Sequence, residues 1–176
     1  IDGVQVEIHF TPSWMNCYFT NRHLQKFFQQ SRRFDRLAYT PDVMPTPDIH
    51  FNRVYILLHI YRHLFHEGIG LRQVMDYYFV LLQGFNEDDR IETMKIINRL
   101  KMGRFASAIM WILKDVFCIN EQYLITSPNE AEGRFLLEEI MRAGNLGLHD
   151  KRISRGRHES DISHGLRKVA RNFRFI

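Results

Sequence analysis

Cysteine is scarce in this sequence: only Cys17 and Cys118 occur among the 176 residues, and they are far apart. Two distant cysteines form neither a disulfide framework nor a zinc-binding pattern. We therefore expect each to be a small buried apolar residue. The usage fits a reducing compartment, so the prediction for location is the cytoplasm.

Long hydrophobic runs are also missing. The longest is "VYILLHIY", over residues 54–61, and His59 interrupts it. A membrane-spanning helix needs about 20 apolar residues, so no membrane span is predicted. There is no Gly-rich phosphate loop and no Ser/His/Asp order typical of nucleophilic hydrolases. The 45% hydrophobic content is enough for one buried core.

The body of the chain has no net positive charge. The net charge is +4, but residues 151–176 alone carry eight Lys or Arg against two acidic residues. Residues 1–150 are therefore slightly acidic. The basic tail, with Phe173 and Phe175, could bind nucleic acid or an acidic membrane surface. The simpler interpretation is a solvated helix face anchored by a few aromatic residues.

One β-strand is predicted at the start, where "VQVEIHF" (residues 4–10) alternates apolar and polar residues. Its polar face carries Glu7 and His9. A strand needs a partner for its backbone groups. The loop at 36–47 could hold a short extended pair, around residues 37–39 and 43–44. The partner of the first strand is expected to lie outside this sequence, with a hairpin within the chain or a second copy of the chain as the alternatives.

The rest of the sequence predicts helices. Asn86, followed by three acidic residues, is expected to begin one of them, and Gly68 and Gly84 to end two others. Thr46-Pro47-Asp48 and Ser127-Pro128-Asn129-Glu130 are typical helix starts. The expected ranges are about 20–31, 47–66, 70–83, 86–102, 104–117, 128–143 and 161–173, with loops at 36–47 and 145–160.

Three histidines on the second predicted helix share one face: His59, His63 and His66, spaced i, i+4, i+7. Two histidines at i, i+4, such as His59 and His63, could bind a metal ion. The zinc-protease pattern, however, requires Glu directly after the first His, and Ile60 stands there. Alternatively, the imidazoles form hydrogen bonds within a mostly buried helix. In a third interpretation they face a cleft and, with Arg62, meet an anionic ligand.

Arg72 and Asp76 are spaced i, i+4 on the next predicted helix, among apolar residues. A structural salt bridge between them is the favoured interpretation. The alternative is that Asp76 positions Arg72 so that its guanidinium binds a phosphate.

Four stretches in this order carry a resemblance: "VEIHF", "PTP", "VYILLHIYRHLF" and "GIGLRQVMDYYFVLL". Over roughly residues 4–84 the sequence resembles an uncharacterised nucleotidyltransferase family, similar to DNA polymerase β-type transferases. The resemblance implies a small mixed sheet followed by helices, and an enzyme that uses Mg²⁺. It implies that Glu7 is the third metal-binding, catalytic carboxylate. It further implies nucleotide contacts from His59, Arg62, His63, Arg72 and Asp76.

The chain departs from that family pattern in one respect: it lacks the Gly-Ser turn and the Asp-x-Asp pair that supply the first two carboxylates. We therefore expect a mainly α fold, a bundle of six to seven helices with one or two short N-terminal strands left from a nucleotidyltransferase sheet. Residues 1–12 are expected to be the last strand of a truncated core, 13–150 a helical domain, and 151–176 a basic loop and helix.

The leading functional prediction is the C-terminal helical portion of a nucleotidyltransferase, either a truncation or a degenerate member. The complete protein would transfer a nucleotidyl group from a nucleoside triphosphate to an unknown acceptor. The fragment is expected to be inactive alone and to hold no cofactor, and it could dimerise through its N-terminal strand. The alternative is a non-catalytic helical module that binds protein or RNA. A metal-dependent helical hydrolase ranks last, because carboxylate ligands are missing.

Overall fold

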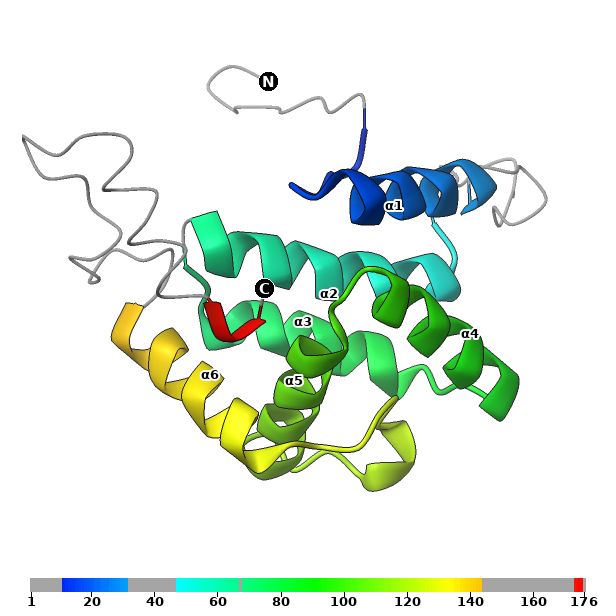
Figure 1. Cartoon of the computed structure of the whole chain (residues 1–176). Coiled ribbons are helices and arrows are strands. Elements are labelled where there is room, and N and C mark those ends of the chain that lie inside the picture. Colours follow the sequence, from blue (N-terminus) through cyan, green and yellow to red (C-terminus); the bar gives the residue numbers. More distant parts are fainter. Residues whose placement is uncertain (1–10, 32–46, 67, 144–172, 176) are drawn as a thin grey trace, which may run out of the picture.

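The computed structural model describes residues 11–31, 47–66, 68–143 and 173–175, and within these ranges it is mainly helical (Figure 1). The predicted mainly α class is confirmed. The described residues contain no strand. The predicted strand at residues 4–10 lies outside them, and so does the predicted helix at 161–173 except for its last residue, Phe173. The elements are α1 (Tyr18–Ser31), α2 (Ile49–His66), α3 (Leu71–Leu82), α4 (Glu87–Arg99), α5 (Gly103–Asp115), η2 (Glu121–Tyr123), α6 (Glu130–Ala143) and η4 (Phe173–Phe175).

Helix ends follow the local signals. The Asn86 side chain accepts a hydrogen bond from the backbone N–H of Asp89 at 2.8 Å and so caps α4 as predicted. Gly68 and Gly84 have φ angles of 87° and 74°, in the left-handed region where glycine carries no Cβ penalty. The Gly68 N–H donates to the His63 carbonyl at 2.8 Å, which closes the end of α2.

Two helix starts differ from the prediction by a few residues. The carboxylate of Asp48, two residues after the predicted cap, caps α2, because it accepts from the N–H of Phe51 at 2.7 Å. Similarly, Asn129 rather than Ser127 caps α6 by accepting from the N–H of Glu132 at 3.1 Å. In both places several cap-forming residues follow one another, and only the backbone geometry decides which one is used.

The core lies where α2, α3 and α5 meet, and α2 packs against both α3 and α4. Along α3, Val74, Tyr77 and Leu81 are buried at helical spacing, so one face points inward. The α1 helix lies across α2 at the edge of the bundle (Figure 1). Aromatic side chains join these two helices: Phe28 contacts both Phe51 and Tyr55 at ring-centroid distances of 5.9 and 6.4 Å.

The α5 and α6 helices approach one another closely. Gly133 of α6 lies against Trp111 of α5, and a Cβ built on Gly133 would be 2.4 Å from the Trp111 ring. A glycine here allows the two helices to pack at short range. No helix among the described residues is long and apolar enough to cross a membrane.

The η4 turn docks beside α2, α5 and α6 (Figure 1). Phe175 is 4% exposed, and its ring contacts those of Phe105 and Phe135. The Arg174 guanidinium donates to the Glu132 carboxylate at 2.6 Å. The hydroxyl of Tyr61 donates to the carbonyl of Phe175 at 3.2 Å. Phe175 is therefore an anchoring aromatic, in line with the simpler interpretation of the tail.

The prediction for the cysteines was wrong, since Cys17 and Cys118 are both exposed. Cys17 directly precedes α1, and its carbonyl accepts from the hydroxyl of Thr20 at 3.0 Å. Cys118 follows α5 with a φ angle of 54°, at a point where the chain reverses. Both residues stand at helix termini, where side chains project away from the core.

Candidate functional site

A polar surface on α2 carries three of the predicted site residues: His59, Arg62 and His63. The rings of His59 and His63 are 4.3 Å apart between centroids, at an interplanar angle of 63°. The predicted shared face is therefore confirmed for these two, and the side chain of His66 lies outside the described residues. His59 is exposed and His63 half-buried, so at least one imidazole of this surface faces solvent.

Arg62 fixes the incoming chain against this α2 surface. Its guanidinium donates to the hydroxyl of buried Ser13 at 3.0 Å and lies 3.6 Å from the centroid of the Trp14 ring. Two turns earlier on α2, the hydroxyl of Tyr55 donates to the carbonyl of Pro12 at 3.5 Å. A guanidinium stacked on an indole ring is held in one orientation. The described chain thus enters the fold directly beside the two histidines.

Arg72 and Asp76 lie on the outer face of α3, and both are exposed. In the described part of the chain no hydrogen bond or ion pair joins them, so the predicted salt bridge is wrong. The inward face of α3 is formed by Val74, Tyr77 and Leu81, which turns positions 72 and 76 toward water. Solvated charges need no partner, and an exposed pair would contribute little to stability.

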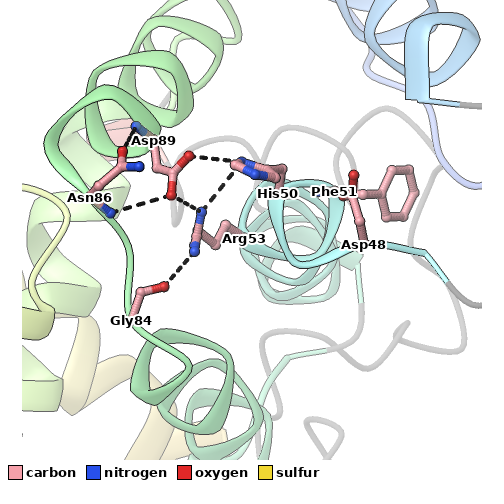
Figure 2. Close-up of polar contacts among 7 residues, drawn as sticks. All are labelled: Asp48, His50, Phe51, Arg53, Gly84, Asn86 and Asp89. Atoms are coloured by element: carbon pink, nitrogen blue, oxygen red, sulfur yellow. Dashed lines mark hydrogen bonds and ion pairs between the residues drawn. The ribbon is translucent and has the colours of Figure 1, made fainter. Parts of the chain in front are cut away.

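The sequence analysis missed a buried cation, Arg53, which is 2% exposed. Figure 2 shows its guanidinium between the carbonyl of Gly84 and the carboxylate of Asp89. One terminal nitrogen donates to Gly84, and the other lies 3.7 Å from Asp89. Asp89 also lies 3.5 Å from Nδ1 of His50. Through these contacts α2 is joined to the α3–α4 loop and to the first turn of α4.

We call Arg53, His50, Gly84 and Asp89 the Arg53 cluster. Two buried polar atoms at this cluster have no hydrogen-bond partner: Nε of Arg53 and the hydroxyl oxygen of nearby Tyr77. Burial raises the pKa of Tyr77 well above its ordinary value, and the positive charge of Arg53 opposes this rise. A signal for Arg53 was available in the sequence. It precedes Leu57, Ile60 and Leu64 by four, seven and eleven residues, which places it on the buried face.

A divalent metal ion finds no fitting ligand set among the described residues. They contain no group of three His, Cys, Asp or Glu side chains that could hold one. The predicted ligand Glu7 lies outside the described residues. Mg²⁺ prefers an octahedral shell of oxygen ligands, usually including one or two carboxylates.

Of three comparisons with known proteins, the one against protein families gives a match. Neither the curated proteins nor the solved structures contain a significant match to the chain. The sequence profile of a family described as "Uncharacterised nucleotidyltransferase" matches residues 2–118. This range includes Glu7, all of α1 through α5, and every residue of the polar surface on α2. The chain therefore belongs to this uncharacterised nucleotidyltransferase family.

Proposed function

We propose that this chain forms the helical part of a nucleotidyltransferase. In the complete protein an oxygen of the acceptor would attack the α-phosphorus of a nucleoside triphosphate, and pyrophosphate would leave. The single observation that carries this proposal is the family match over residues 2–118. The helices would form one wall of the nucleotide site, and the catalytic carboxylates would come from the sheet.

The α2 polar surface is the part of the wall that we assign to the triphosphate. Arg62 supports this assignment, because its guanidinium is already oriented by Ser13 and Trp14. His59 and His63 add two imidazoles within one turn of it. Arg72 is solvent-exposed and can present its planar fork to a phosphate. Asp76, one turn further along α3, is proposed to bind a donor group of the nucleotide.

Glu7 is the proposed metal ligand, consistent with the position where the described chain begins. Ser13, which is fixed to Arg62, is six residues after Glu7, and six extended residues span at most roughly 20 Å. The proposal requires the carboxylate at position 7 to lie within that reach of Ser13. Two further carboxylates would be needed to hold Mg²⁺, and the described residues do not supply them. We therefore expect no transfer activity from this chain alone.

We propose that the chain is divided into three parts. Residues 1–12 would complete the sheet of the transferase core, 13–150 would form the helical domain, and 151–176 would form a basic extension. Pairing of two chains through residues 4–10 also stays a prediction, because those residues lie outside the described ranges.

A second candidate function is a non-catalytic module that binds a protein. It is favoured by exposed aromatic side chains at the start of α1, where Trp14, Tyr18 and Phe19 are 48%, 70% and 72% exposed. Large exposed aromatics of this kind are typical of binding surfaces. In that case Arg62 would position Trp14 for the partner, and nucleotides would bind neither this chain nor a longer form of it.

The test is a thermal-shift panel of nucleoside triphosphates with Mg²⁺, on this chain and on a longer form that contains the Gly-Ser and Asp-x-Asp segments. A ligand at 100 times its Kd stabilises the state that binds it by about 2.7 kcal/mol. We expect a shift for the longer form with at least one triphosphate. No shift with any triphosphate would overturn the transferase proposal.

Variants of the longer form locate the nucleotide contact. Arg62→Gln should weaken triphosphate binding roughly tenfold, since a charge-assisted hydrogen bond contributes about 1.5–3 kcal/mol. Arg22→Gln is the matched control, because Arg22 is exposed on α1 and lies outside the α2 polar surface. Each shift is measured against the same variant without ligand. Equal losses in both variants would remove Arg62 from the site.

A further inference from the structure

A groove lies away from the α2 polar surface. It has a volume of about 630 Å³ and lies between α1, α2 and α4. Its floor reaches the core at Thr93 and Leu100, which are 3% and 0% exposed. This volume is typical of a small-molecule site. The groove begins at His50, twelve residues before Arg62, which corresponds to roughly 18 Å along the helix.

Charge is arranged unevenly within the groove. Along α4 the lining residues Asp88, Glu92, Lys95 and Arg99 recur on one face, with acids in its N-terminal half and bases in its C-terminal half. Lys26 of α1 lines the same groove and adds a third full positive charge. The C-terminal half of α4 therefore gives the groove two positive charges, and the N-terminal half gives it carboxylates that can accept hydrogen bonds.

One wall of the groove is aromatic. Phe27 of α1 and Phe51 of α2 line it, and their rings are stacked at 5.7 Å with an interplanar angle of 12°. Next to Phe51, the His50 side chain is 39% exposed and lies 3.5 Å from Asp89 of the Arg53 cluster (Figure 2). The wall is thus anchored to the buried Arg53, which fixes the relative position of α2 and α4.

We propose that this groove binds a small organic phosphomonoester. The phosphate would lie among Lys26, Lys95 and Arg99. Hydroxyl or amino groups of the ligand would donate to Asp88 and Glu92. The aromatic wall would cover the less polar side of the ligand. Binding follows from the groove alone, whereas identifying the ligand as the acceptor of the nucleotidyl group rests on the proposed function.

The experiment is calorimetric titration of the 176-residue chain with ribose 5-phosphate, without triphosphate or metal. Parallel titrations use AMP, inorganic phosphate and ribose. We expect both phosphomonoesters to bind more tightly than inorganic phosphate, and ribose to show no binding. The affinity should fall as salt is raised, because the anchoring charges are exposed. No binding of either phosphomonoester at millimolar concentration, or equal affinity for inorganic phosphate, would overturn the proposal.

Matched variants separate a specific groove from general attraction to positive charge. Lys26→Gln combined with Arg99→Gln removes two lining charges and should weaken ribose 5-phosphate binding at least about tenfold. The control, Arg22→Gln with Arg90→Gln, removes two exposed charges of the same helices outside the groove and should change affinity less than about twofold.

Equal loss in the two double variants would refute the groove assignment. Should the double lining variant fail to fold, as judged by far-UV circular dichroism, Arg99→Gln alone carries the comparison. The outcome is independent of the transferase proposal, because it requires neither the triphosphate nor the catalytic carboxylates. Failure of the triphosphate panel would therefore leave this result intact, and failure here would leave the triphosphate site intact.

Discussion

Replacing Gly133 by alanine tests the close approach of α5 and α6. The added methyl carbon would lie 2.4 Å from Cε3 and 2.6 Å from Cβ of Trp111. Carbon atoms pack favourably at roughly 3.5–4.0 Å. The two helices would therefore have to separate by about 1 Å, or the Trp111 ring would have to rotate. Trp111 is only 7% exposed, so rotation would displace its buried neighbours.

The expected loss follows from two opposing effects. Overpacking a well-filled core costs about 1–3 kcal/mol, and the contact distances place this site at the upper end. Alanine gains about 1 kcal/mol over glycine in a helix interior. We expect Gly133→Ala to lower the free energy of unfolding by roughly 2 kcal/mol, measured by urea denaturation and far-UV circular dichroism. The midpoint of thermal unfolding should fall by about 4–8 °C.

Gly103→Ala is the matched control at the start of α5. A Cβ at Gly103 would be 2.6 Å from Oδ1 of Asn98, but this atom is the end of an exposed side chain that can rotate away. Its free energy of unfolding should stay within about 0.5 kcal/mol of the wild type. The reasoning is refuted if Gly133→Ala is as stable as the wild type, or if both variants lose the same amount.

Three further predictions concern stability. Arg53→Ala should lower the free energy of unfolding in urea by roughly 3 kcal/mol, because the half-buried Gly84 carbonyl loses its donor and Asp89 loses its cation. The control, exposed Arg90→Ala, should change it by less than about 0.5 kcal/mol, and equal changes would contradict a special role for Arg53. Tyr77→Phe should leave stability unchanged or raise it by up to about 1 kcal/mol at pH 7, because the hydroxyl is buried without a partner. Burial raises the pKa of Tyr77, so the folded chain keeps this proton longer than the unfolded chain, and wild-type stability should fall as pH rises above about 10. Between pH 7 and pH 11 the midpoint of thermal unfolding should fall less for Tyr77→Phe than for the wild type. An identical fall in the two proteins would refute this prediction. Lys101 has a φ of 62°, a left-handed conformation that glycine adopts without the steric cost of a Cβ. Lys101→Gly should therefore raise the free energy of unfolding in urea by about 1 kcal/mol. A lower urea midpoint for the variant would count against backbone strain at this position.

Helix positions could be predicted from the sequence because their signals are local. Asn86 caps α4 through an atom three residues away, and Gly84 ends the preceding turn through its own φ angle. Where several cap-forming residues compete, as at Asp48 and Asn129, the choice depends on how the whole helix is placed. Local patterns do not contain that information.

Prediction of the site was less complete, for a related reason. The contact between His59 and His63 follows from helical spacing and was foreseen. The same spacing suggested a bond between Arg72 and Asp76, but spacing does not say which face is solvated. The carbonyl that Arg53 binds is 31 residues away, at Gly84. The position of Arg53 on the apolar face of its helix was enough to predict its burial. Its partner could be identified only from the tertiary structure.

The docking of η4 has a practical consequence for defining the folding unit. The family match stops at residue 118, yet α6 and Phe175 cover apolar side chains of α5. A protein shortened to the matched residues would leave Trp111 and Phe105 facing water. Such a shortened chain should aggregate or unfold, so residue 118 does not mark the end of the folding unit.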